Sequence, residues 1–88
     1  MELGGNIVLE GFDGVDQGKL IVIKKIAGSF VKHVSEKKEY DNVTFSLNGE
    51  YIIKINVKLK DSEINSENED KNLFFALTNA IKSVESQL

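Results

Sequence analysis

Hydrophobic and polar positions separate most clearly in residues 19–36. When these residues are wound at about 100° each, as in an α-helix, the apolar and polar side chains fall on opposite sides. The apolar side consists of Leu20, Ile23, Ile26, Ala27, Phe30, Val31 and Val34. The polar side consists of Lys24, Lys25, Ser29, Lys32, His33 and Glu36. The pattern predicts an amphipathic helix with a solvated, mainly basic outer side that ends near residue 36 or 37.

Three details refine the prediction of this helix. Ile21 and Val22 lie off its apolar side, so we expect a neighbouring element to cover the first turn. Gly28 lies in the interior, where glycine costs up to about 1 kcal/mol relative to alanine, and a close contact with a neighbouring backbone would explain it. Asp13 or Asp16, in the turn sequence before the helix, is expected to cap its first amides.

The helical period returns in residues 71–88. A continuous apolar stripe there consists of Leu73, Phe74, Ala76, Leu77, Ala80, Ile81, Val84 and Leu88. Asp70 stands where it could cap the amino end of this helix. Phe75 points away from the stripe, toward the side that an amphipathic helix usually gives to water. The pattern predicts a second helix with one buried side and one aromatic residue opposite to it.

Alternation of apolar and polar residues, which is typical of half-buried strands, occurs in three segments. In residues 6–12, Ile7 and Leu9 share one face. In residues 43–47, the inward positions are Val43, Phe45 and Leu47. In residues 51–60, the inward positions are Tyr51, Ile53, Ile55, Val57 and Leu59, and the outward positions are Ile52, Lys54, Asn56, Lys58 and Lys60.

The last two of these strands are joined by Asn48-Gly49, a sequence typical of a hairpin turn. A two-residue loop would place the apolar face of one strand against the polar face of the other, because directly opposite residues share a face. We therefore predict a three-residue loop at residues 47–49, with Gly49 in the left-handed conformation, or an equivalent bulge. This register pairs Phe45 with Tyr51 and Val43 with Ile53.

The order of elements is β-α-β-β-(β)-α, because the polar residues 63–68 after the turn at 61–62 can form a short strand or a loop. Each helix has one apolar stripe and each long strand one apolar face. Both helices are therefore expected to pack on one face of a three- or four-stranded, mainly antiparallel sheet. We predict an α+β fold and a single domain, residues 1–88, whose open sheet face carries Thr44, Ser46, Lys54, Asn56, Lys58 and Lys60.

Composition narrows the class of protein. The chain has 88 residues, of which 41% are hydrophobic, enough for one modest core. Cysteine is absent and histidine occurs once, which excludes a disulfide framework, a thiol nucleophile and a metal site built on several imidazoles. There is no apolar run of roughly 18 to 20 residues, and the first five residues lack the features of a signal peptide. We expect a cytoplasmic protein without a membrane contact.

Catalytic chemistry is not indicated. The acidic residues Glu63, Glu67, Glu69 and Asp70 lie in a polar segment with nothing to bury them, and their spacing is not that of a calcium loop. His33 has no second ligand or nucleophile nearby in the pattern, and the glycines of residues 11–18 lack the spacing of a nucleotide-binding loop. The sequence therefore predicts no enzyme, with no catalytic residue, metal, cofactor or small-molecule substrate.

Charge favours binding surfaces over active sites. Residues 1–60 carry nine lysines and eight acids, residues 61–88 carry two lysines and six acids, and there is no arginine. One lysine group, Lys24, Lys25 and Lys32, lies on the first helix, and another, Lys54, Lys58 and Lys60, forms a row on the open sheet face. Either group could contact phosphates, or it could simply keep its surface solvated.

Phe75 has two interpretations of its own. It could pack under a loop or a terminus, or it could contact another protein. In the second case, a homodimer formed through Phe75 or a free strand edge is the simplest partner.

One part of the chain resembles a known family. Residues 63–67, EINSE, are followed by a short polar link, by residues 72–77, NLFFAL, and by the late pair Gln87-Leu88. This arrangement resembles the closing strand and helix of ribosome hibernation factors, small ribosome-associated inhibitors with a β-α-β-β-β-α fold. The likeness covers residues 63–88 as a motif and nearly the whole chain as a topology. Departures from the family are the acidic net charge, the lack of arginine and a shorter hairpin.

The resemblance implies a role in translation regulation through binding to the channel of the small ribosomal subunit by basic residues on the helices. The matching positions are Lys24, Lys25 and Lys32 on the first helix and Lys82 on the second. It also favours a strand at residues 63–68. The predicted function is thus a non-catalytic ribosome- or RNA-associated module, and the alternative is a protein-interaction module without nucleic-acid binding.

Overall fold

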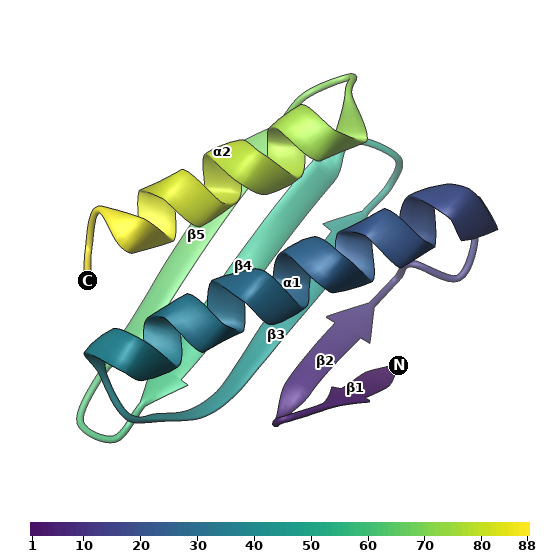
Figure 1. The fold of residues 1–88 in the computed structure, drawn as a ribbon. Helices are drawn as coiled ribbons and strands as arrows, with labels where there is room; N and C mark the ends of the chain where they lie inside the picture. The colour runs from purple at the N-terminus through teal and green to yellow at the C-terminus, as the bar shows by residue number, and fades with distance from the viewer.

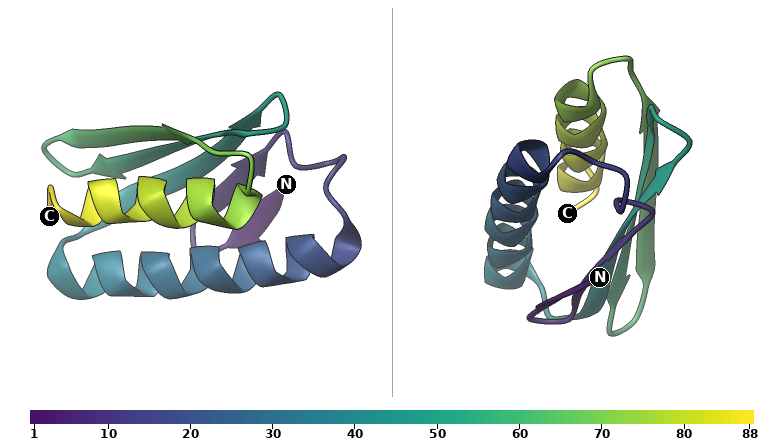
Figure 2. Two further views of the ribbon diagram at one scale, coloured as in Figure 1. Left: turned by 90° about the horizontal axis from the view of Figure 1, so that it is seen from above. Right: turned by 90° about the vertical axis from the view of Figure 1, so that its right-hand side faces the viewer.

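The structure, a computed structural model, describes residues 1–88 and has an α+β fold. Its elements are β1 (Glu2–Gly4), β2 (Ile7–Glu10), α1 (Gln17–Lys37), β3 (Tyr40–Asn48), β4 (Ile52–Leu59), β5 (Glu63–Glu69) and α2 (Leu73–Glu85). The strands form one sheet in the order β1-β2-β3-β4-β5, in which only the β2–β3 pair is parallel. Both helices cover the same face of this sheet, side by side, as predicted (Figures 1 and 2).

The sheet has five strands, so the prediction of three or four strands was too low. The polar segment before α2 is a strand, β5, and not a loop. The added strand is β1, which turns into β2 through Gly4, Gly5 and Asn6, all with positive φ. The charged amino group of Met1 donates to the Leu9 carbonyl at 2.8 Å. β1 is thus held mainly by its backbone, which explains why hydrophobic alternation did not reveal it.

The β3–β4 hairpin has the predicted faces but not the predicted register. Val43 pairs with Val57 and Phe45 pairs with Ile55, because the two strands continue to the pair Asn48–Ile52. The three-residue loop is therefore residues 49–51, two positions later than expected, and it places Tyr51 in the turn instead of in the strand. Gly49 has the predicted left-handed conformation, with φ of 66°. A shift of two residues on each strand leaves every side chain on its original face.

Helix α1 confirms the predicted stripe and corrects two expectations. Asp16 is its cap, with a carboxylate oxygen that accepts from the Lys19 amide at 3.3 Å. No element covers the first turns, because Ile21 and Val22 are 54% and 44% exposed. No backbone approaches Gly28 closely either, since a Cβ added there would meet no neighbouring atom within 4 Å.

Gly11, just after β2, is the glycine with a steric role. Its φ is 79°, and a Cβ at this position would collide with the carbonyl oxygen of Leu47 on β3. The chain leaving β2 therefore passes directly against the end of β3 before it turns toward α1. Only glycine allows this close approach without displacing the strand.

Helix α2 is shorter than predicted and is capped by a different residue. The side-chain oxygen of Asn72 accepts from the amides of Phe74 and Phe75 at 2.9 and 3.2 Å. Asp70, the expected cap, instead accepts from the Asn72 amide at 2.8 Å and thereby stabilises the turn before the helix. Asparagine and aspartate both suit this position, so the pattern alone could not choose between them.

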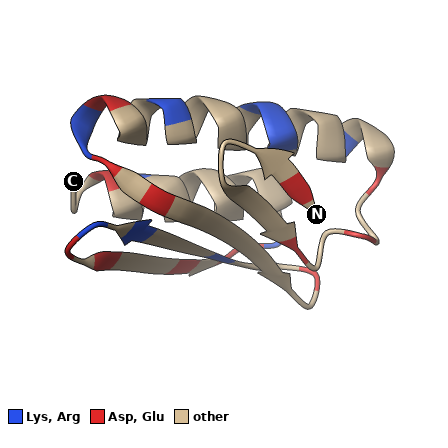
Figure 3. Cartoon of the chain, turned by 90° about the horizontal axis from the view of Figure 1, so that it is seen from below, with Lys and Arg blue, Asp and Glu red and all other residues tan.

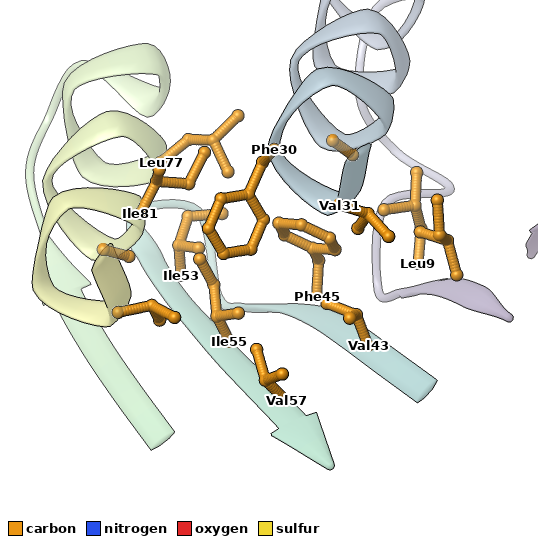
Figure 4. Packing of buried hydrophobic residues seen from close by; sticks show 14 of the residues in the cluster. Leu9, Phe30, Val31, Val43, Phe45, Ile53, Ile55, Val57, Leu77 and Ile81 are labelled. Carbon is orange, nitrogen blue, oxygen red and sulfur yellow. The ribbon is translucent and has the colours of Figure 1, made fainter. Parts of the chain in front are cut away.

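The core lies between the helices and the sheet and consists entirely of apolar residues. Its centre is formed by Phe30 of α1 and Phe45 of β3, whose rings meet edge to face with centroids 6.0 Å apart. Leu77 and Ile81 of α2 point toward Ile53 and Ile55 of β4 (Figure 4). Both helices are therefore fixed to the sheet by large side chains, and only their outer sides are available for binding.

Candidate functional site

The outer side of α1 carries the first predicted lysine group. Lys24, Lys25 and Lys32 are all exposed, and none of the ion pairs in the structure involves them. Lys25 and Lys32 are seven residues apart and differ by only about 20° around the helix axis, whereas Lys24 lies about 100° from Lys25. The group therefore divides into a row of two lysines and one lysine to its side.

Lys25, but not Lys32, lines an open groove between the two helices. The groove has a volume of about 440 Å³ and is lined by Lys25, Ile26, Ser29 and Phe30 of α1 and by Thr78, Ile81, Lys82 and Glu85 of α2. Lys25 and Lys82 thus approach it from opposite helices. Lysines on both sides of a groove with hydroxyl groups can bind a phosphate chain as point charges with added hydrogen bonds.

His33 and Glu85 mark the far end of this groove. His33 Nε2 lies 3.7 Å from Glu85 Oε2 on α2, and His33 Nδ1 lies 4.0 Å from Glu36 Oε1 on its own helix. The positive side chains of the groove are therefore followed by two carboxylates toward the carboxyl ends of the helices.

The lysines of the open sheet face have acidic neighbours. Lys54 Nζ lies 3.4 Å from Glu67 Oε1 on β5. Lys58 stands directly opposite Glu63 in the same ladder but forms no ion pair. Lys60 lies outside the strand, in the turn after β4, with its Nζ 2.9 Å from Glu39 Oε2. In Figure 3 lysine segments recur along α1, while the strands and loops carry both signs. The two predicted lysine groups thus differ in their surroundings, although they look alike in sequence.

Phe75 is exposed, as its position in the helix predicted, and its exposed fraction is 60%. No loop or terminus covers it, so the interpretation of a shielded aromatic residue was wrong. Its role in a protein contact stays a prediction.

The acidic residues near β5 lie on the open side of the sheet. Glu63, Glu67 and Glu69 are exposed, and they share the open side of the sheet because they alternate along one strand. No group of three His, Asp or Glu side chains in the structure could hold a metal ion. No charged or polar residue is buried, and neither helix has the length and apolar character that crossing a membrane requires.

The fold defines a class of small α+β proteins in which two helices lie on one face of a mainly antiparallel sheet. Within this class, the structure is similar to the N-terminal domain of Protein Y from Thermus thermophilus, with a TM-score of 0.63 and 19% identity over 99% of this chain and 94% of that chain. It is also similar to a ribosomal subunit interface protein from Coxiella burnetii, with a TM-score of 0.57 and 19% identity over 93% and 91%.

These similarities show a shared fold across nearly the whole of each chain. They agree, at the level of the fold, with the resemblance to ribosome hibernation factors seen in residues 63–88. No protein-family model and no curated protein sequence matches the chain.

Proposed function

We propose that the protein is a non-catalytic, ribosome-associated module that contacts ribosomal RNA through the outer surface of its two helices. The surface is formed by Lys24, Lys25, Lys32 and Lys82, here called the helix-face lysines. One of the two similar structures is, by its name, a ribosomal subunit interface protein. Together with the resemblance of residues 63–88 to ribosome hibernation factors, this supports a ribosomal partner and a place in the cytoplasm.

One observation carries the proposal: the helix-face lysines have no ion-pair partner, whereas each lysine of the sheet face has an acid beside it. A lysine that neutralises a phosphate releases the counterion condensed on the nucleic acid, and a lysine already paired with an acid is less able to do so. Net charge is −3, so an RNA contact has to be local. The helical layer is the surface where lysines accumulate without compensation, and the groove between Lys25 and Lys82 adds a shape that a phosphate chain could follow.

The test compares two triple variants with identical net charge. In the first, Lys25, Lys32 and Lys82 are replaced by glutamine, and in the second Lys54, Lys58 and Lys60 are replaced by glutamine. Binding to purified ribosomes is measured by co-sedimentation over a range of salt concentrations. We expect the helix variant to lose at least about tenfold in affinity and to depend less steeply on salt, by roughly one unit of the logarithmic slope for each lost phosphate contact.

The sheet variant should stay within about threefold of the natural protein, because Lys54 and Lys60 are ion-paired and Lys58 stands opposite Glu63. Equal losses in both variants would contradict the assignment to the helices. A natural protein that does not co-sediment with ribosomes even at low salt would overturn the proposed function itself.

A further inference from the structure

An exposed apolar patch lies on the helical layer beside the lysines. It consists of Ile21 and Val22 on α1 and Phe75 on α2, which are three of the five large hydrophobic residues that the structure exposes. None of the three belongs to the buried stripe of its helix. A helix side that faces only water normally carries polar residues, so these positions indicate a contact with another macromolecule.

The residues of this helix-start patch lie at the same end of the helical layer, although Phe75 is more than 50 positions from Ile21 and Val22 in sequence. The contact between His33 and Glu85 fixes the register of the two helices at one end. Val22 and Phe74 each lie eleven residues, or just over three full turns, before this pair toward the amino ends of the helices. Phe75 is the next residue, and the helices lie side by side with their amino ends at the same end of the molecule (Figure 2). The patch therefore includes residues of both helices at this end of the molecule.

The charges around this end of the molecule suit a partner that carries both signs. A hollow of about 720 Å³ between the helix starts and the β3–β4 turn is lined by two acids and two lysines, Asp16, Glu50, Lys19 and Lys71. None of the four takes part in an ion pair of the structure. RNA would meet the two carboxylates as well as the lysines, so a polyanion is a poor match for this rim.

We propose that the helix-start patch is the interface through which two copies of this chain associate. A two-fold axis places the same surface of both copies face to face, so that each copy can set its lysines against the acids of the other. Phe75 supplies the large aromatic anchor that such interfaces require at their centre. A stable interface needs about 800 Å² from each partner. With a total accessible surface of 5278 Å², this is about 15% of the surface of the chain.

The position of the patch has a consequence for the helix-face lysines, and this consequence rests on the function proposed above. Lys25 follows Ile21 by four residues and Val22 by three, so it lies one helical turn from both. A second copy seated on the patch would cover part of the ribosome-binding surface. Dimer formation and ribosome binding should then exclude each other.

The experiment measures the oligomeric state of the full chain by sedimentation velocity between about 1 µM and 1 mM. The natural protein should show a monomer–dimer equilibrium that depends on concentration. Phe75→Ser and Val22→Ser should each raise the dissociation constant at least about tenfold, because each removes an apolar side chain from the interface. Lys58→Gln, on the open sheet face and therefore away from the helices, is the control and should leave the dimer equilibrium unchanged.

Circular dichroism of each variant verifies that the fold persists, which is expected because both substituted side chains are exposed. A natural protein that stays monomeric at 1 mM would overturn the proposal and assign the patch to a different partner or to none. A dimer that is equally strong in Phe75→Ser and Val22→Ser would overturn it too, by placing the interface elsewhere. Neither result would bear on the ribosome measurements, so the two proposals fail separately.

Discussion

The two faces of the sheet are formed by the same strands but have different roles. Toward the helices, Val43 and Phe45 of β3 and Ile53, Ile55 and Val57 of β4 are almost completely buried. Toward water, the same strands carry hydroxyl, amide and charged groups that contact one another, such as Asn56 Nδ2 and Asn65 Oδ1 at 2.7 Å. One face therefore supplies the stability, and the other satisfies its own polar groups. The outer side of the helices differs from both faces, because its lysines form no ion pair.

The largest expected effect tests this division at two adjacent residues of β3. Phe45→Ala should lower the free energy of unfolding by about 3–5 kcal/mol, because it removes a buried ring from the contact with Phe30 and leaves a cavity. Thr44→Ala, on the open face, should cost less than about 1 kcal/mol. Chemical denaturation of both variants measures the difference. Similar losses would show that the open face is covered in solution and that the comparison of the two faces is incorrect.

Much of this division could be predicted from sequence, because it depends on periodicity. The stripe of α1 and the alternation in β3 and β4 fixed which face of each element is buried. The hairpin register could not be predicted in the same way, since loops at residues 47–49 and 49–51 both keep apolar residues opposite apolar residues. Only the structure distinguishes the two loops. It places Tyr51 in the turn, where its carbonyl oxygen accepts from the Asp70 amide at 3.1 Å.

The edge strands were harder to predict for another reason. In β5 the residues that face α2 are Ile64, Ser66 and Asn68, of which only the first is apolar. Ser66 Oγ donates to the Ala80 carbonyl at 2.9 Å, so the strand meets its helix partly through a hydrogen bond. A hydropathy pattern cannot signal such a contact. The resemblance to a known family did favour a strand here, and the structure confirms it.

The candidate site was predictable as a set of residues but not as a set of neighbours. The positions of the lysines on α1 followed from the helical period. The pairing of Lys54 with Glu67 depends on β5 joining the sheet beside β4, and the approach of Lys82 to the groove depends on how α2 packs beside α1. The exposure of Ile21 and Val22 was missed because apolar residues were assumed to be covered.

A smaller effect of opposite sign is expected on the outer side of α1. Gly28→Ala should raise the free energy of unfolding by about 0.5–1 kcal/mol, because alanine favours the helix and the added methyl group meets no neighbour. Thermal and chemical denaturation measure the gain. Ribosome binding of this variant should stay unchanged, since no charge is altered. A loss of stability would mean that another part of the protein packs on this side of α1 in solution.

The smallest expected effect concerns the ion pair between Lys54 and Glu67 on the open face. Both side chains are more than half exposed, so water screens their attraction, and a double-mutant cycle with alanine should give a coupling of roughly 0.2–0.5 kcal/mol. A coupling above about 1 kcal/mol would show an open face that contributes to stability in its own right.

The effect of the glutamates on binding should be larger than their effect on stability. Replacing Glu63 and Glu67 by glutamine removes the acids directly opposite Lys54 and Lys58 in β5. This variant should bind structured RNA more tightly at low salt, and the gain should disappear as salt increases. An unchanged RNA affinity would mean that the acids of β5 do not keep RNA from the lysines of the sheet face. The lack of acidic partners would then not be what distinguishes the helix-face lysines from those of the sheet face.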